Sequence, residues 1–121
     1  MTFTRSKPWD ALVKHRQDLA PLHLRELFAQ DPDRVARLSM SFDGLYYDFS
    51  KQRLTPETLG LLRVLADEAG VADGIRRMFA GERINNTEDR AVLHTALRRS
   101  VGPFPGGDQD VMGEVLATRR R

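Results

Sequence analysis

A change in the spacing of apolar residues between positions 37 and 50 constrains the fold of this chain more than any other feature. Apolar residues recur every three or four positions on both sides of this segment, whereas within it they alternate with polar residues. A period of two is typical of β-strands. Asp43-Gly44 divides the segment and suits the positive φ angles of a type I′ turn, so we predict a β-hairpin over residues 37–50. Its apolar positions are Leu38, Met40 and Phe42, then Leu45, Tyr47 and Phe49.

Helices are predicted before the hairpin, and because two strands alone are only marginally stable, we expect helices to cover one hairpin face. The first helix carries an apolar face and ends near residue 19. Pro21 lacks an amide proton and suits the first turn of a second helix, which runs to Asp31-Pro32. Asp31 then caps a short turn through Val35. The apolar faces are Trp9, Leu12 and Val13 in the first helix and Leu24, Leu27 and Phe28 in the second.

Capping signals mark further helices after the hairpin. Thr55 is a good N-cap and Pro56 fits the first position of a helix that ends at Gly70. A shorter helix ends at Gly81, which can adopt the left-handed conformation. The predicted buried face of the longer helix consists of Leu61, Leu62, Val64, Leu65 and Ala69, and the shorter helix is marked by Ile75, Met78 and Phe79.

The last third of the chain is predicted to contain two helices separated by a loop. Thr87 caps a helix that runs to Arg99, and the glycine- and proline-rich residues 101–107 form a surface loop. Asp110 opens an amphipathic segment that reaches Arg121 without a stop signal, as though the chain were cut inside a helix. Its apolar residues are Val111, Met112, Val115 and Leu116. We expect the apolar faces of both terminal helices to lack partners, and the isolated chain to self-associate through them or leave them mobile.

Composition fits one domain, mainly α with one β-hairpin. The chain has 121 residues, of which 40% are apolar, and the absence of cysteine excludes disulfides and thiolate metal sites and points to the cytoplasm. Basic and acidic residues number 19 and 17 and are interspersed, so no nucleic-acid-binding surface is predicted. The first ten residues lack the apolar segment of a signal peptide, so none is predicted, and no apolar run approaches the roughly 20 residues that span a membrane.

The histidines and glycines predict no metal, cofactor or phosphate site. His15, His23 and His94 lie too far apart for the spacing that places two imidazoles on one metal, and each is expected to be a half-buried packing or hydrogen-bonding residue. Residues 102–107 are rich in glycine but lack the preceding strand and the following Lys-Ser or Lys-Thr of a phosphate-binding loop.

Glu88 and Asp89 are adjacent carboxylates that could suggest acid–base chemistry. Neighbouring residues on a helix point away from each other, and acidic residues in a first helical turn stabilise its positive end. We therefore expect both to serve the start of the predicted helix. The sequence assigns no catalytic, cofactor-binding or metal-binding residue to this chain.

Several sequence blocks, taken in order, are similar to one enzyme family. The blocks are residues 23–28 with Asp31-Pro32, residues 48–51, residues 78–79 with 81–85, residues 87–98, and residues 110–112 with Val115-Leu116. Together they resemble the amino-terminal segment of the glucose-6-phosphate isomerase family, from about Trp9 to the last residue. Departures are few, chiefly Phe49 where tyrosine is usual and Asp89 where glycine or lysine is common.

The resemblance implies that residues 1–121 are the amino-terminal helical and hairpin segment of a larger α/β enzyme of the sugar isomerase type. It places both sugar-phosphate-binding domains beyond Arg121, with the catalytic glutamate, the ring-opening histidine, the phosphate-holding Ser/Thr cluster and the supporting arginine and lysine. His94 is therefore not assigned a catalytic role. The implied partners are the remainder of the polypeptide, a second subunit of the full-length homodimer and, only in that enzyme, the sugar phosphate.

On this reading the isolated chain is structural and catalytically inactive, and the implied enzyme interconverts glucose 6-phosphate and fructose 6-phosphate. One alternative is an independent helical module that binds other proteins. A nucleic-acid-binding domain is a more distant alternative.

Overall fold

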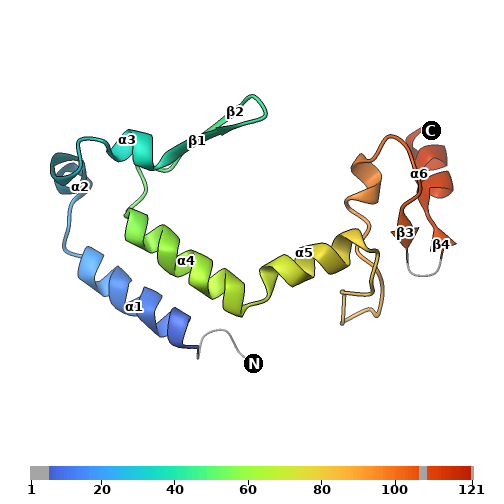
Figure 1. The fold of residues 1–121 in the computed structure, drawn as a ribbon, viewed down its shortest axis with the longest axis horizontal. Helices are drawn as coiled ribbons and strands as arrows, with labels where there is room; N and C mark the ends of the chain where they lie inside the picture. The colour runs from blue at the N-terminus through green and yellow to red at the C-terminus, as the bar shows by residue number, and fades with distance from the viewer. Residues whose placement is uncertain (1–5, 107–108, 121) are drawn as a thin grey trace. The chain divides into compact units, whose positions relative to one another are not determined.

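A computed structural model of the chain describes residues 6–106 and 109–120, which form two compact units, Met1–Ala69 and Gly70–Arg121 (Figure 1). The first unit contains α1 (Lys7–Leu19), α2 (Leu24–Gln30), α3 (Arg34–Arg37), β1 (Ser39–Phe42), β2 (Leu45–Asp48) and α4 (Pro56–Glu68). The second contains α5 (Val71–Phe79), a short 3-10 helix η2 (Ala96–Arg98), β3 (Pro105–Gly106), β4 (Gln109–Asp110) and α6 (Met112–Arg119). The prediction of a mainly helical chain with a β-hairpin is confirmed.

Helices α1 and α4 lie side by side and form the body of the first unit (Figure 1). The hydroxyl of Ser6 caps α1 by accepting the Trp9 amide hydrogen, and α1 ends at Leu19, as predicted. Helix α4 follows Thr55, also as predicted, and Thr58 Oγ1 accepts the Thr55 amide hydrogen at 2.9 Å. The predicted buried face of α4 is only partly covered. Leu61, Leu65 and Ala69 are half-buried, whereas Leu62 and Val64 are exposed.

The predicted starts of α2 and α3 are wrong. Helix α2 begins at Leu24 rather than at Pro21, because His23 caps it: His23 Nδ1 accepts the Arg25 amide hydrogen at 3.1 Å, and the Glu26 carboxylate accepts the His23 amide hydrogen at 2.6 Å. Asp33, rather than Asp31, is the residue before α3. The Asp31 carboxylate instead lies 3.5 Å from the guanidinium of Arg37.

The hairpin of β1 and β2 is confirmed, with Met40 opposite Tyr47 and Phe42 opposite Leu45. Asp43 and Gly44 form its turn with φ angles of 47° and 77°. Leu38 lies outside β1 and is buried, and its carbonyl accepts the Phe49 amide hydrogen at 2.7 Å. The expectation that helices cover one hairpin face is wrong for the described part of this unit, since the apolar side chains of both strands are exposed.

In the second unit, α5 is followed by Gly81 at a φ of 71°, as predicted. The helix predicted from Thr87 to Arg99 does not form. The Asn85 side-chain oxygen accepts hydrogen bonds from the amide and hydroxyl of Thr87, and Asn85 pairs with Arg90 across an isolated antiparallel bridge. Asp89 adopts a φ of 47°, which is incompatible with a right-handed helix, so this segment is a turn and only η2 remains helical.

The core of the second unit joins residues that are distant in sequence. It consists of Ala96, Phe104, Met112 and Val115, with Leu93, Val111 and Leu116 packed against it. Residues 101–106 are therefore not simply a surface loop: Phe104 is buried, and Pro105–Gly106 pairs with Gln109–Asp110 in a second, short hairpin. Gly107, the last residue of the predicted loop, and Arg121 lie outside the described residues. The apolar face of α6 is not bare, since Met112 and Val115 are buried in this core.

Candidate functional site

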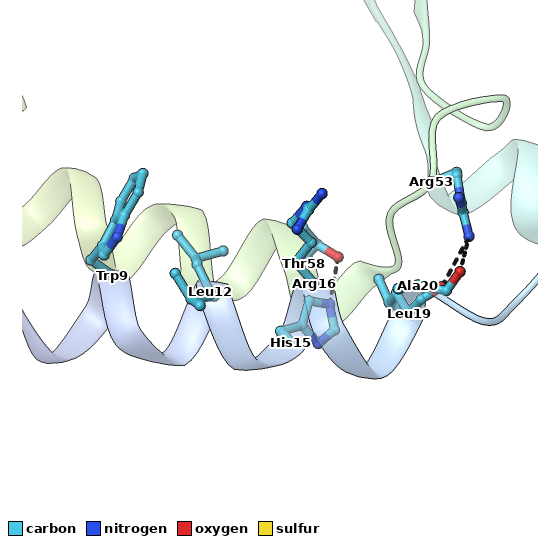
Figure 2. A pocket seen from close by; sticks show the side chains of 9 residues that line it. Trp9, Leu12, His15, Arg16, Leu19, Ala20, Arg53 and Thr58 are labelled. Atoms are coloured by element: carbon cyan, nitrogen blue, oxygen red, sulfur yellow. Dashed lines mark hydrogen bonds between the residues drawn. The ribbon is translucent and has the colours of Figure 1, made fainter. Parts of the chain in front are cut away.

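An apolar groove of about 570 Å³ follows α1 in the first unit (Figure 2). The α1 residues that line it recur at helical spacing, so they form one flank of that helix. Figure 2 shows Trp9, Leu12 and Arg16 in succession along α1, with Arg53 at the end of the groove. The lining residues are Trp9, Leu12, Val13, His15, Arg16, Leu19, Ala20, Arg53 and Thr58.

His15 links α1 to α4 at the base of this groove. It is 8% exposed, and its Nε2 lies 2.7 Å from the Thr58 hydroxyl oxygen. Its Nδ1 lies 3.7 Å from a carboxylate oxygen of the exposed Glu57. Thr58 also accepts the amide hydrogen of Thr55, so the imidazole is tied into the start of α4. This confirms the prediction of a hydrogen-bonding, packed histidine at this position.

Two arginines bind backbone carbonyls and fix the chain around the groove and the hairpin. Arg53 Nη2 donates to the carbonyls of Ala20 at 2.6 Å and Leu22 at 2.7 Å, beyond the end of α1. Arg34 is 1% exposed, with its guanidinium 5.4 Å from the centre of the Phe28 ring. It donates to three carbonyls between β2 and α4, those of Ser50 at 2.8 Å, Gln52 at 2.7 Å and Leu54 at 2.8 Å.

A second pocket, of about 620 Å³, lies within the second unit and includes Arg83, Asp89, Arg90 and His94. Its arginines are already paired. Arg83 Nη1 lies 3.1 Å from Asp89 Oδ2, and Arg90 pairs with the Glu88 carboxylate. Glu88 and Asp89 thus neutralise two different arginines on a turn. The expectation that Glu88 and Asp89 stabilise the start of a helix is wrong, because no helix forms there.

The remaining predicted positions are structural or exposed. His23 caps α2, as expected of a hydrogen-bonding residue, but His23 and His94 are both exposed, contrary to the expectation of half-burial. In the glycine-rich segment, a Cβ on Gly106 would lie 2.3 Å from Val111 Cγ1, so this glycine permits close packing. Asp110 Oδ1 accepts the amide hydrogens of Phe104 at 2.9 Å and Met112 at 3.1 Å. These amides, that of Phe104 first, hold the pKa of Asp110 below its ordinary value.

Most of the titratable side chains at the two pockets have partners within their own unit. Within residues 6–106 and 109–120, no three His, Asp or Glu side chains are grouped so that they could hold a metal ion. In the part of the chain that the structure describes, no helix is both long and apolar enough to cross a bilayer. Among the polar residues that line the first groove, His15 and Thr58 bind each other and Arg53 binds the carbonyls that follow α1, while most of the remaining lining residues are apolar.

Comparison with known proteins decides the family. Residues 48–121, well over half of the chain, match the family described as phosphoglucose isomerase. The chain belongs to the phosphoglucose isomerase family. This confirms the family indicated by the sequence blocks and disfavours an unrelated interaction module.

Curated phosphoglucose isomerase relatives extend the likeness to the whole chain. The glucose-6-phosphate isomerase of Shewanella oneidensis is 51% identical over 116 residues, which cover 95% of this chain and 21% of the relative. The enzyme of Chlorobium luteolum is 50% identical over 122 aligned positions, which cover 100% of this chain and 22% of the relative. The enzyme of Gloeobacter violaceus is 50% identical over 119 positions, which cover 98% of this chain and 22% of the relative. The chain spans about a fifth of the length of these relatives.

Several positioning residues of this phosphoglucose isomerase segment were missed by sequence reasoning. Ser6 followed by Pro8 is a start signal that could have located α1, and His23 with Glu26 has the spacing of a capping box. Arg34 and Arg53 carried no such local signal, because their partners are carbonyls more than fifteen residues away.

Proposed function

We propose that this chain is the amino-terminal part of a glucose-6-phosphate isomerase, and that its role in that enzyme is structural. Identity of about one half to three full-length isomerases, over nearly all of this chain, is the observation that carries the proposal. The full enzyme would interconvert glucose 6-phosphate and fructose 6-phosphate in the cytoplasm, as a homodimer and without a cofactor.

On this proposal the catalytic groups lie in the four fifths of the enzyme that this chain does not cover. Residues of the two pockets support it, because Arg53, Arg83, Arg90 and His15 already bind carbonyls, carboxylates or a hydroxyl. The segment would pack on the catalytic domains of the same polypeptide. Alone, it should have neither isomerase activity nor a bound metal.

The isolated chain tests the first part of this proposal. It should be purified from a host that lacks isomerase and assayed for conversion of fructose 6-phosphate to glucose 6-phosphate with a coupled dehydrogenase. We expect no turnover above the buffer blank, with or without added Zn²⁺ or Mg²⁺. Turnover that increases in proportion to chain concentration would refute inactivity.

A chimera tests the second part. The matching 116 residues of the Shewanella oneidensis enzyme are replaced by this chain, and a matched control carries an unrelated helical segment of equal length. We expect the chimera to retain isomerase activity and the control to lose it, because only this chain presents the packing surfaces that the remainder requires. A folded chimera without activity would contradict the proposal.

A further inference from the structure

The hairpin of the first unit presents a continuous apolar face that no described residue of that unit covers. Residues directly opposite in an antiparallel pair share a face, so Met40 and Phe42 of β1 lie on one side with Leu45 and Tyr47 of β2. Their exposed fractions are 53%, 68%, 56% and 41%. None of the four is charged. We call these four residues the hairpin face.

The opposite side of the same strands differs in composition. It consists of the cross-strand pairs Ser39 with Asp48 and Ser41 with Tyr46. Within the first unit the hairpin extends from α3 away from the pair formed by α1 and α4 (Figure 1). Because a two-stranded sheet alone is only marginally stable in water, an uncovered apolar face of this kind indicates a missing partner.

The size of the hairpin face favours a covalently attached partner over a second copy. Four side chains of this type present on the order of 100 Å² each, or about 400 Å² together. Stable complexes between separate proteins bury about 800 Å² on each partner, roughly twice as much. A neighbour in the same polypeptide loses little translational and rotational freedom on docking, so a smaller contact suffices.

We propose that the hairpin face docks against an uncharged, apolar surface in the part of the full-length polypeptide that lies outside these 121 residues. This inference rests on the proposed function. It is supported by the share of the relatives that this chain covers, 21–22%, which leaves most of each enzyme available as the partner. The lack of charge on the hairpin face excludes a partner that is recognised through charge pairing.

Thiol labelling tests this docking, because the chain contains no cysteine of its own. Phe42→Cys places a thiol on the hairpin face, and Tyr46→Cys is the matched control on the opposite side, where exposure is similar at 62% against 68%. Each variant is prepared in the isolated chain at low micromolar concentration and in the Shewanella oneidensis chimera. Labelling by a maleimide is followed at the substituted peptide by mass spectrometry.

We expect the two thiols to react at similar rates in the isolated chain. In the chimera the labelling rate of the Phe42→Cys thiol should fall by a factor of about ten or more. The labelling rate of the Tyr46→Cys thiol should change little, because docking protects one side only. Met40→Cys, on the same face, replaces Phe42→Cys if that variant fails to fold.

Two other results would overturn the inference. Equal, fast labelling of both thiols in the chimera would show that the hairpin face stays free. Slow labelling of Phe42→Cys in the isolated chain as well would place the cover within these 121 residues or in a second copy. Isomerase activity of the unsubstituted chimera reports on the proposed function separately, so an active chimera with an unprotected hairpin face would reject the docking alone.

Discussion

Arg34 is a buried residue that binds the backbone at three points in the first unit. Its buried guanidinium donates to three carbonyls of the segment that joins β2 to α4, and the Gln52 carbonyl also accepts the Leu54 amide hydrogen, so one side chain ties together the backbone of this segment. Replacement of Arg34 by lysine should not preserve these hydrogen bonds, because an ammonium group lacks the planar set of donors of a guanidinium. Arg34 therefore holds the segment between the hairpin and α4 in place.

The effect of Arg34 can be measured by urea unfolding. Arg34→Ala should lower the free energy of unfolding of the first unit by about 3 kcal/mol, since buried carbonyls lose charged donors. Arg37→Ala is the control on the same helix: its guanidinium is exposed and lies near the carboxylates of Asp31 and Asp33, and its loss should cost at most about 1 kcal/mol. Similar losses in the two variants would mean that the three carbonyls find other donors.

Among the elements, the hairpin and the helix starts show what local sequence can predict. The Asp43-Gly44 turn and the cap of α4 depend on residues within four positions of one another, and both were predicted correctly. The helix predicted after Thr87 does not form, because the Asn85 side chain binds the backbone that follows it. The burial of Phe104 and Met112 depends on contacts across the second unit, which periodicity cannot locate.

The hairpin turn gives a prediction at this scale. Gly44 has a φ of 77°, which a β-branched residue resists, so Gly44→Val should destabilise the hairpin by about 1 to 2 kcal/mol. Gly44→Asn is the matched control, because asparagine tolerates the left-handed region, and it should stay close to the parent. Thermal unfolding followed by tyrosine fluorescence measures both. An unchanged transition in the valine variant would place the turn elsewhere.

Asp110 at the start of α6 gives a pH-dependent prediction. Because its folded-state pKa is lowered by the Phe104 and Met112 amides, its contribution to stability is present above the unfolded pKa of about 3.9 and is lost as pH falls through the lower, folded value. Asp110→Asn should therefore be less stable than the parent at pH 6, and the difference should shrink below pH 3.

Urea unfolding of the second unit at pH 6 and at pH 2.5 measures this difference, with both proteins under identical salt. Glu114→Gln, on the exposed side of α6, serves as the control for the loss of one carboxylate. A difference between parent and Asp110→Asn that persists unchanged at the lower pH would show that the charge of Asp110 does not matter.

On the scale of the whole molecule, stability should be distributed differently from what the sequence suggests. The sequence predicts terminal helices that self-associate or stay mobile and a helix after Thr87, whereas the structure buries α6 against Phe104 and leaves the hairpin face exposed. Burial of Met112 and Val115 is worth about 1.5 to 3 kcal/mol each. The hairpin gains only cross-strand contacts of about 0.2 to 1 kcal/mol per pair.

Hydrogen exchange of the isolated chain tests this order. Each change of about 1.4 kcal/mol in the free energy of local opening changes the exchange rate by a factor of ten. If α6 is more stable than the hairpin by about 3 kcal/mol, its amides should be protected roughly a hundredfold more than those of β1 and β2. Met112→Ala should remove much of the α6 protection and leave the hairpin amides unchanged, because Met112 packs only within the core of the second unit described here. Hairpin amides that exchange as slowly as those of α6 would show that the hairpin face is covered within this chain or by a second copy of it, and that its stability needs no further part of a longer polypeptide.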